Sequence, residues 1–296
     1  MQKKIIALAI AAAVSAPAFA DNANVTIYGI ADMSYDYINT GNSAAGVAGA
    51  SKPNVSSNVS RLGLKGAEDL GDGLAAVWQI EQQINMDGSG TSSFATRNTF
   101  AGLKSESVGT VLLGRHDTPY KLATRKLDVF GDSIADNRSL MGGVSGSVTA
   151  GAITSAKSAY ASFDGRQPDV IAYISPAMSG FTGAVAYVNL NEGATAGATA
   201  KANALSLAGM YDAGPFFGSL GYEQHKLDTV RVGGKEHAWK LGFGYTIDAF
   251  TLGLAYEKTT DNLGRGLNTA VGAACAAQVA GSNCFGHSAY YLAGTY

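Results

Sequence analysis

Large apolar residues alternate with small or charged residues in several separate segments of the chain. In Trp239–Tyr245 every odd position is large and apolar, and every even position is small or charged. Phe250–Glu257 repeats this pattern, and Leu74–Glu81 follows it over the same length. Successive side chains of a β-strand point to opposite faces, so each segment predicts a strand with one apolar and one polar face.

The same pattern predicts about twelve strands along the chain. They cover residues 24–37, 58–66, 74–85, 96–104, 108–115, 167–175, 181–190, 202–211, 216–225, 236–246, 249–258 and 287–296. Short turns are expected at 68–73, 105–107, 176–180, 212–215 and 247–248, and longer loops at 38–57, 86–95, 116–166, 191–201, 226–235 and 259–286. Short turns on one rim and long loops on the other are typical of an outer-membrane β-barrel.

A soluble β-sandwich is the alternative fold, because its core would require the same alternation. Two features favour the membrane barrel. The polar face carries Lys, Glu, Gln and Gly over strands of about 9–11 residues, which is the length of a tilted membrane strand. Many tyrosines also fall near strand ends, where they suit the interface between lipid and water. Because an unpaired backbone edge is costly in a bilayer, such a sheet must close on itself.

Met1–Ala20 has the pattern of a signal peptide. Lys3 and Lys4 precede a short apolar stretch, and the segment ends in Ala-Phe-Ala, so the mature chain is expected to begin at Asp21. A membrane anchor is the alternative, but about ten apolar residues are too few to span a bilayer. The sequence therefore predicts an exported protein with a leader at 1–20 and one barrel domain at 21–296.

Composition narrows the function classes. The chain has 296 residues, 38 of them glycine, and only 15% are charged. Without Lys3 and Lys4 the 21 basic residues fall to 19 against 23 acidic ones, so the net charge moves from −2 to −4. That balance gives no support for a nucleic-acid partner. The four histidines are scattered without zinc spacing, and Cys275 and Cys284 are predicted to form a loop disulfide, which export permits.

The segment 116–166 is much longer than the other predicted loops. It contains Asp128, Asp132 and Asp136, with Arg125 and Arg138 among them. A loop of this length is usually functional or disordered. The sequence pattern leaves two positions open for it, either on the surface in water or folded into a wide barrel with a polar interior.

Basic residues lie on the strands around this loop. Leu62 and Leu64 occupy the apolar face of their strand, so Arg61 and Lys65 are expected to face the lumen, because a lipid-facing Arg would cost about 2–4 kcal/mol. Arg97 and Arg115 also fall at strand ends near the loop. The orientation of Arg97 stays open, since its strand alternates poorly, and rim charges in solvent are the alternative for all four residues.

Several stretches resemble general porins of Gram-negative outer membranes, of the betaproteobacterial and neisserial type. Ser60–Leu74 resembles their strand–turn–strand signature, and Val25–Gly29 their first strand. Gly109–Arg115 and Ile171–Pro176 match later strands, and Asp128–Asp132 resembles the tip of their constriction loop. The resemblance extends along the whole chain.

This resemblance implies a homotrimer of water-filled barrels in outer-membrane lipid, with the third loop folded into the lumen. Ions and small hydrophilic solutes would diffuse passively, and no cofactor or metal is expected. On the basic side of the constriction the resemblance places Arg61, Lys65, Arg97 and Arg115, and on the acidic side Asp128, Asp132 and Asp136. The counts of charge lean towards anions but leave the sign of selectivity open.

The chain departs from the family at its end. Members of the family that it resembles usually have sixteen strands and end in Phe, whereas about twelve strands are predicted here and the sequence stops at Tyr296. We expect a sequence truncated at its C-terminus, with a natural shorter barrel as the alternative.

An enzyme and a structural barrel are the two other functions to compare with a channel. An enzyme is not expected, because G-x-S-x-G is absent and Gly71–Ala76, which fits a loose dinucleotide pattern, is followed by a strand instead of a helix. A structural or adhesive outer-membrane barrel without an open pore remains the alternative to a diffusion channel.

Overall fold

The computed structural model describes residues 24–39, 51–88, 94–133, 135–142, 163–190, 202–227, 235–260 and 287–296. The predicted signal peptide and the predicted pair Cys275 and Cys284 lie outside these residues. Among the described residues, no helix is long and apolar enough to cross a membrane.

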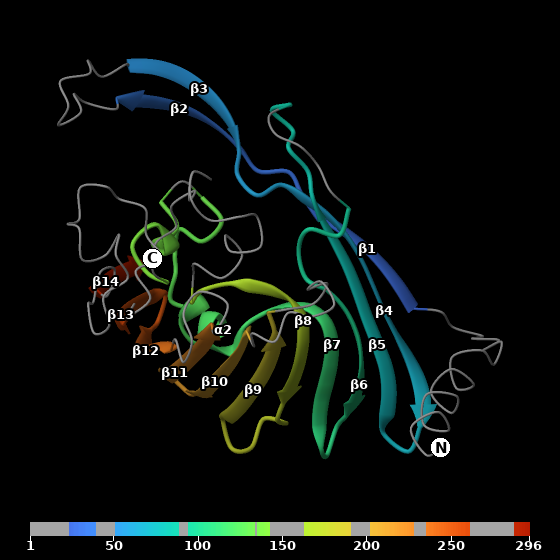
Figure 1. The fold of residues 1–296 in the computed structure, drawn as a ribbon. Coiled ribbons are helices and arrows are strands. Elements are labelled where there is room, and N and C mark those ends of the chain that lie inside the picture. Colours follow the sequence, from blue (N-terminus) through green and yellow to red (C-terminus); the bar gives the residue numbers. More distant parts are fainter. Residues whose placement is uncertain are drawn as a thin grey trace.

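The described chain is dominated by one antiparallel sheet of twelve strands, as the alternation predicted. Its members are β1 (Asn24–Ile30), β4 (Arg61–Gly71), β5 (Leu74–Gln83), β6 (Thr99–Ser105), β7 (Gly109–Asp117), β8 (Arg166–Ile174), β9 (Phe181–Asn189), β10 (Ala202–Ala213), β11 (Phe216–Leu227), β12 (Lys235–Ile247), β13 (Phe250–Thr260) and β14 (Ser288–Thr295). Apart from the pair β1–β4, each strand pairs with its neighbour in the chain, and β1 and β14 are the two edges. The sheet curls around a concave face (Figure 1).

Side chains alternate between the two faces of this sheet, and the exposed face is the apolar one. In β12, Leu241 and Phe243 are 46% and 45% exposed, whereas Lys240 between Trp239 and Leu241 is 1% exposed. In β10, Leu205 and Leu207 are exposed while Ser206 is fully buried. A protein folded in water would place leucine inside and lysine outside. The sheet therefore has the inverted polarity of a barrel that faces lipid on its convex side.

The first expected strand is broken in two. Residues 24–37 were expected as one strand and 38–57 as a loop; instead β2 (Met33–Asn39) and β3 (Ser51–Ser57) form a separate hairpin beyond the main sheet (Figure 1). At the break the Ser60 hydroxyl accepts from the Asp32 N–H and donates to the Asp32 carbonyl, both at 2.9 Å. These bonds give partners to the backbone N–H and carbonyl groups of Asp32, which lies between β1 and β2 and outside their strand pairing.

The predicted long loop at 116–166 carries a short helix on the concave face. Helix α2 (Pro119–Arg125) begins after Thr118, whose side chain accepts from the Lys121 N–H, and Pro119 occupies the first turn. It packs against β9, β10, β11 and β12 (Figure 1). A 3₁₀ turn, η1 (Asn137–Ser139), follows further along the segment. Of the two open positions, α2 and the described residues around it occupy the inward one.

Candidate functional site: a charged loop on the inner wall

Small wall residues let α2 approach the sheet. A Cβ atom added to Gly221 of β11 would lie 3.0 Å from the Ala123 Cβ, and one added to Gly242 of β12 would lie 3.1 Å from the Thr124 Cγ2. Both distances are shorter than ordinary carbon contacts. The glycines that make these strands unusual for a soluble protein therefore provide room for the loop inside the sheet.

Buried polar contacts fix α2 to β12 and β13. The Tyr120 hydroxyl donates to Glu257 Oε2 at 2.6 Å, and Glu257 Oε1 also accepts from the Gly142 N–H at 2.6 Å. Lys240 Nζ lies 4.3 Å from the centre of the Tyr120 ring and 2.5 Å from Asp164 Oδ1. All these side chains are buried. We call this group, namely Tyr120, Asp164, Lys240 and Glu257, the anchor cluster.

A second set of contacts holds the entry to the loop. Asp117, at the end of β7, forms ion pairs with Lys121, whose Nζ lies 2.7 Å away, and with Arg166, whose Nη2 donates to Asp117 Oδ2 at 3.2 Å. The Asn98 side-chain amide also donates to Asp117, at 3.1 Å. Strands β7 and β8, which begin and end the loop segment, are thereby joined to each other and to the helix.

Beyond α2, three aspartates gather around one arginine. Arg125 lies 3.4 Å from Asp128, 2.7 Å from Asp132 and 3.1 Å from Asp136. Arg138 binds Asp136 through two nitrogens, Nε and Nη2, at 2.9 and 2.8 Å. The three acidic residues named by the sequence therefore lie together, but their principal counter-ions come from the same loop.

The loop meets the wall through Arg61. Its Nη1 donates to Asp132 Oδ2 at 3.0 Å, across 71 residues of sequence. Behind it on β5, Glu81 lies 3.8 Å from Arg61 Nε and 2.5 Å from Arg97 Nε, and it accepts from the Tyr28 hydroxyl at 2.9 Å. Arg61, Arg97, Glu81 and the loop residues Arg125, Asp128, Asp132, Asp136 and Arg138 are called the tip cluster below.

Charges within the tip cluster set the pKa values of its acids. Partial burial raises the pKa of Asp132, but the guanidinium groups of Arg125 and Arg61 outweigh that effect and hold it below its usual value. Burial likewise raises the pKa of Asp136, but the hydrogen bonds from Arg138 outweigh burial and hold that pKa below its usual value. For Asp128, burial and the nearby Asp136 raise the pKa. Asp128 will therefore take up a proton at a higher pH than Asp132 and Asp136 do.

The other two predicted basic residues lie apart from this cluster. Lys65 shares a face with Arg61, as the parity predicted, but it is exposed and its Nζ lies 5.5 Å from the centre of the Tyr28 ring. Arg115 pairs in register with Thr99 on β6, and among the residues that the structure describes no ion pair joins it to the tip cluster. The register of β7 against β8 shifts between Gly114 and His116, on either side of Arg115.

The position of Arg97 explains why the alternation of apolar and polar residues does not predict its orientation. Strand β6 begins at Thr99, so Arg97 precedes the strand and the alternation of Ala101 and Leu103 does not apply to it. Its backbone N–H donates to the Glu81 carbonyl at 3.0 Å, and the side chain is 8% exposed beside the Glu81 carboxylate.

Three members of the tip cluster were not among the predicted site residues. The sequence marks Arg125 and Arg138 only as neighbours of the loop acids, and Glu81 only as a polar-face residue of its strand. Signals for two of them are present in the sequence: Arg125 stands three residues before Asp128, and Glu81 has the parity of the lumen face. The contact of Arg138 with Asp136 depends on the local turn and has no comparable signal.

An outward apolar face, an inward polar face and a charged loop inside the curve define an outer-membrane β-barrel protein of the porin class. The model of the Gram-negative porin family matches residues 7–294, and the chain belongs to that family.

Individual relatives agree with this assignment. The chain is 34% identical over 135 residues to the major outer membrane protein P.IA of Neisseria meningitidis serogroup B (strain H44/76), covering 46% of this chain and 30% of that protein. It is 32% identical over 259 residues to the outer membrane porin protein 32 of Delftia acidovorans, covering 87% and 66%. The solved anion-selective porin from Comamonas acidovorans is 28% identical with a TM-score of 0.64, over 81% of this chain and 68% of that one. The chain thus spans less than two thirds of the length of the Neisseria meningitidis protein and of the Delftia acidovorans porin.

Proposed function

We propose that this protein forms a water-filled channel in the outer membrane, through which ions and small hydrophilic solutes diffuse passively, and that it does so as a homotrimer. The tip cluster carries the proposal: Arg61 on the wall contacts Asp132 on the inward loop at 3.0 Å, so charged groups from both sides meet inside the curve of the sheet. Pore-lining charges at a narrow point sort ions by sign and size. The homotrimer is proposed from the resemblance of the sequence to general porins.

Arginines in the tip cluster remain accessible to passing solutes. The side chains of Arg125 and Arg138 are 29% and 31% exposed, and that of Arg61 is 16% exposed. Four arginines face four acids, Glu81 and the three aspartates, so the cluster by itself is balanced. Exposed Lys65 on the same face as Arg61 adds one positive charge. This distribution supports a preference for anions, and the similar porin from Comamonas acidovorans is itself named as anion-selective.

Planar-bilayer recording in a salt gradient tests this proposal. The wild-type protein should conduct, with a reversal potential that favours anions. Arg61→Ala removes a positive charge beside the ion path, worth about 1 kcal/mol at 4 Å in water, so the anion-to-cation permeability ratio should fall about fivefold. Lys258→Ala removes the same charge from the outward face of β13 and should leave the ratio unchanged. A protein with negligible conductance would instead support a structural or adhesive barrel.

A further inference from the structure

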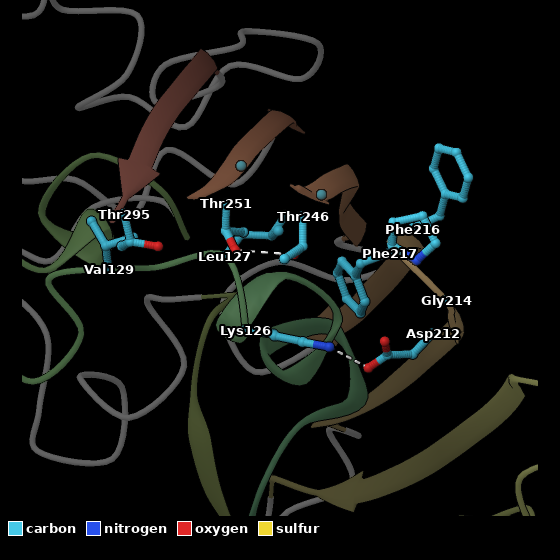
Figure 2. Close-up of a pocket in the computed structure, with 13 residues that line it drawn as sticks. Lys126, Leu127, Val129, Asp212, Gly214, Phe216, Phe217, Thr246, Thr251 and Thr295 are labelled. Atoms are coloured by element: carbon cyan, nitrogen blue, oxygen red, sulfur yellow. Dashed lines mark hydrogen bonds and ion pairs between the residues drawn. The ribbon is translucent and has the colours of Figure 1, made fainter. Parts of the chain in front are cut away.

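A hollow of about 360 Å³ lies on the inner wall, between the segment that follows α2 and the rim formed by the short turns. Lys126, Leu127 and Val129 line it from the loop, and Asp212, Phe217 and Thr251 are among the residues that line it from the wall (Figure 2). This volume is within the range of small-molecule sites, which combine an apolar lining with a few polar groups that fix orientation. The tip cluster does not use these charged residues.

One end of the hollow carries a pair of opposite charges. Lys126 Nζ contacts Asp212 Oδ2, and the two side chains are 57% and 52% exposed (Figure 2). An ammonium group has three donors and a carboxylate has several acceptor positions, so one contact leaves binding capacity on both partners. The pair can therefore bind a ligand that brings one negative and one positive group.

The floor of the hollow is apolar. Leu127 and Phe217 are 5% and 7% exposed, and the Phe217 ring lies 5.2 Å from Lys126 Nζ. Gly253 on the wall has no side chain, and a Cβ there would lie in ordinary contact with the Leu127 side chain, at 3.5 Å from its Cδ2. The ion pair thus stands at the edge of an apolar surface.

We propose that this hollow binds a zwitterionic α-amino acid with an apolar side chain. The ligand carboxylate would bind Lys126, its ammonium group would bind Asp212, and its side chain would lie on Leu127 and Phe217. A purely anionic ligand would meet the Asp212 carboxylate, and a purely cationic ligand would meet Lys126. The inference does not depend on conduction, because a site on the wall can fill whether or not ions pass.

Equilibrium titration of L-phenylalanine into the purified full-length chain in detergent micelles tests the site, by calorimetry or ligand-observed NMR. L-Phenylalanine should bind, whereas glycine, 3-phenylpropionate and phenethylamine should each bind at least tenfold more weakly. Each of these three compounds lacks one of the required groups. Absence of L-phenylalanine binding, or equal binding of 3-phenylpropionate, overturns the proposal.

Two variants locate the binding. Asp212→Asn and Lys126→Met remove one partner each from an exposed ion pair, so the fold should persist, and each should weaken L-phenylalanine binding at least fivefold. Lys104→Met removes an exposed lysine from β6 and is the matched control with wild-type affinity. Wild-type affinity in both pocket variants would place the ligand elsewhere and refute the assignment. Conductance of the same preparations is measured separately, so failure of the site and failure of the channel are distinguishable.

Discussion

The anchor cluster and the tip cluster both lie on the inner wall, and they differ mainly in how far they are enclosed. In the anchor cluster, Lys240 and Glu257 are 1% and 0% exposed and their contacts run to α2 and its neighbouring segments. In the tip cluster, the Arg125 side chain is 29% exposed and that of Asp132 20%. Both groups contain acids, bases and a tyrosine contact.

The degree of enclosure decides what each charge can do. A buried ion pair holds a segment in place, because breaking it leaves a charge without water or partner. A partly exposed charge keeps capacity for ions in solution, and its field is screened only over about 10 Å at 0.1 M salt. We therefore expect substitutions in the anchor cluster to change stability first and those in the tip cluster to change selectivity first.

Glu257→Ala should have the largest effect on stability. It removes the acceptor for the Tyr120 hydroxyl and the Gly142 N–H, both at 2.6 Å, in a buried site. Two hydrogen bonds to a charged group at about 1.5–3 kcal/mol each predict a loss of about 3–6 kcal/mol in the free energy of unfolding. Urea unfolding of the protein in lipid vesicles measures it. Lys258→Ala, at the next position on the outer face, is the control; equal unfolding midpoints in the two variants would show that the anchor cluster contributes little.

Arg125→Ala should affect both properties. The variant leaves Asp128, Asp132 and Asp136 close together without their shared counter-ion. We expect a loss of about 2 kcal/mol in unfolding free energy, since charge-assisted contacts contribute about that much each and the site is partly exposed. In the same bilayer recordings the permeability ratio should move towards cations. A shift towards anions would contradict the position of these acids beside the ion path.

Selectivity should also change with pH through Asp128. Because its pKa is raised, Asp128 takes up a proton at a pH above the usual carboxyl pKa of about 3.9. Asp132 and Asp136, whose pKa values are lowered, stay ionised in that window. The tip cluster then gains one net positive charge, so anion preference should rise as pH falls towards this window. The folded form binds this proton more tightly than the unfolded form does. The contribution of Asp128 to the free energy of unfolding therefore falls as pH rises through the same window.

The matched variant for this titration is Asp128→Asn, which cannot take up the proton. Its permeability ratio should stay flat where that of the wild type changes, measured by reversal potential at each pH. The same pH step in both proteins would assign the titration to another group.

The smallest effects are expected from Lys65→Ala and Arg115→Ala. Lys65 is exposed and contacts only the Tyr28 ring among the interactions of the described residues, so its removal should lower the anion-to-cation ratio less than Arg61→Ala does. Arg115 lies outside the tip cluster, and its removal should leave the ratio within about twofold of wild type. An effect of Arg115→Ala as large as that of Arg61→Ala would contradict this and indicate that Arg115 lies beside the ion path.

Much of the fold could be predicted because lipid imposes a simple rule on the sequence. Wherever a strand crosses hydrocarbon, every second side chain must be apolar, and β12 and β13 carry that rule without exception over their central residues. The hairpin of β2 and β3 was missed for the same reason. Residues 51–57 contain Pro53 and no run of alternating large apolar side chains, so nothing in the pattern distinguishes them from a loop.

Alternation along each strand is enough to predict which face is apolar, and hence that Arg61 is directed inward. The three loop aspartates can also be predicted from the sequence, because acids on a long inserted segment are conspicuous in a chain with few charges. Which charges contact one another depends on the tertiary structure. Arg61 and Asp132 are 71 residues apart, Tyr120 and Glu257 are 137 residues apart, and the curvature of the sheet and the burial of α2 bring them together. Alternation reports on one strand at a time, whereas an ion pair depends on the distance between two side chains in space.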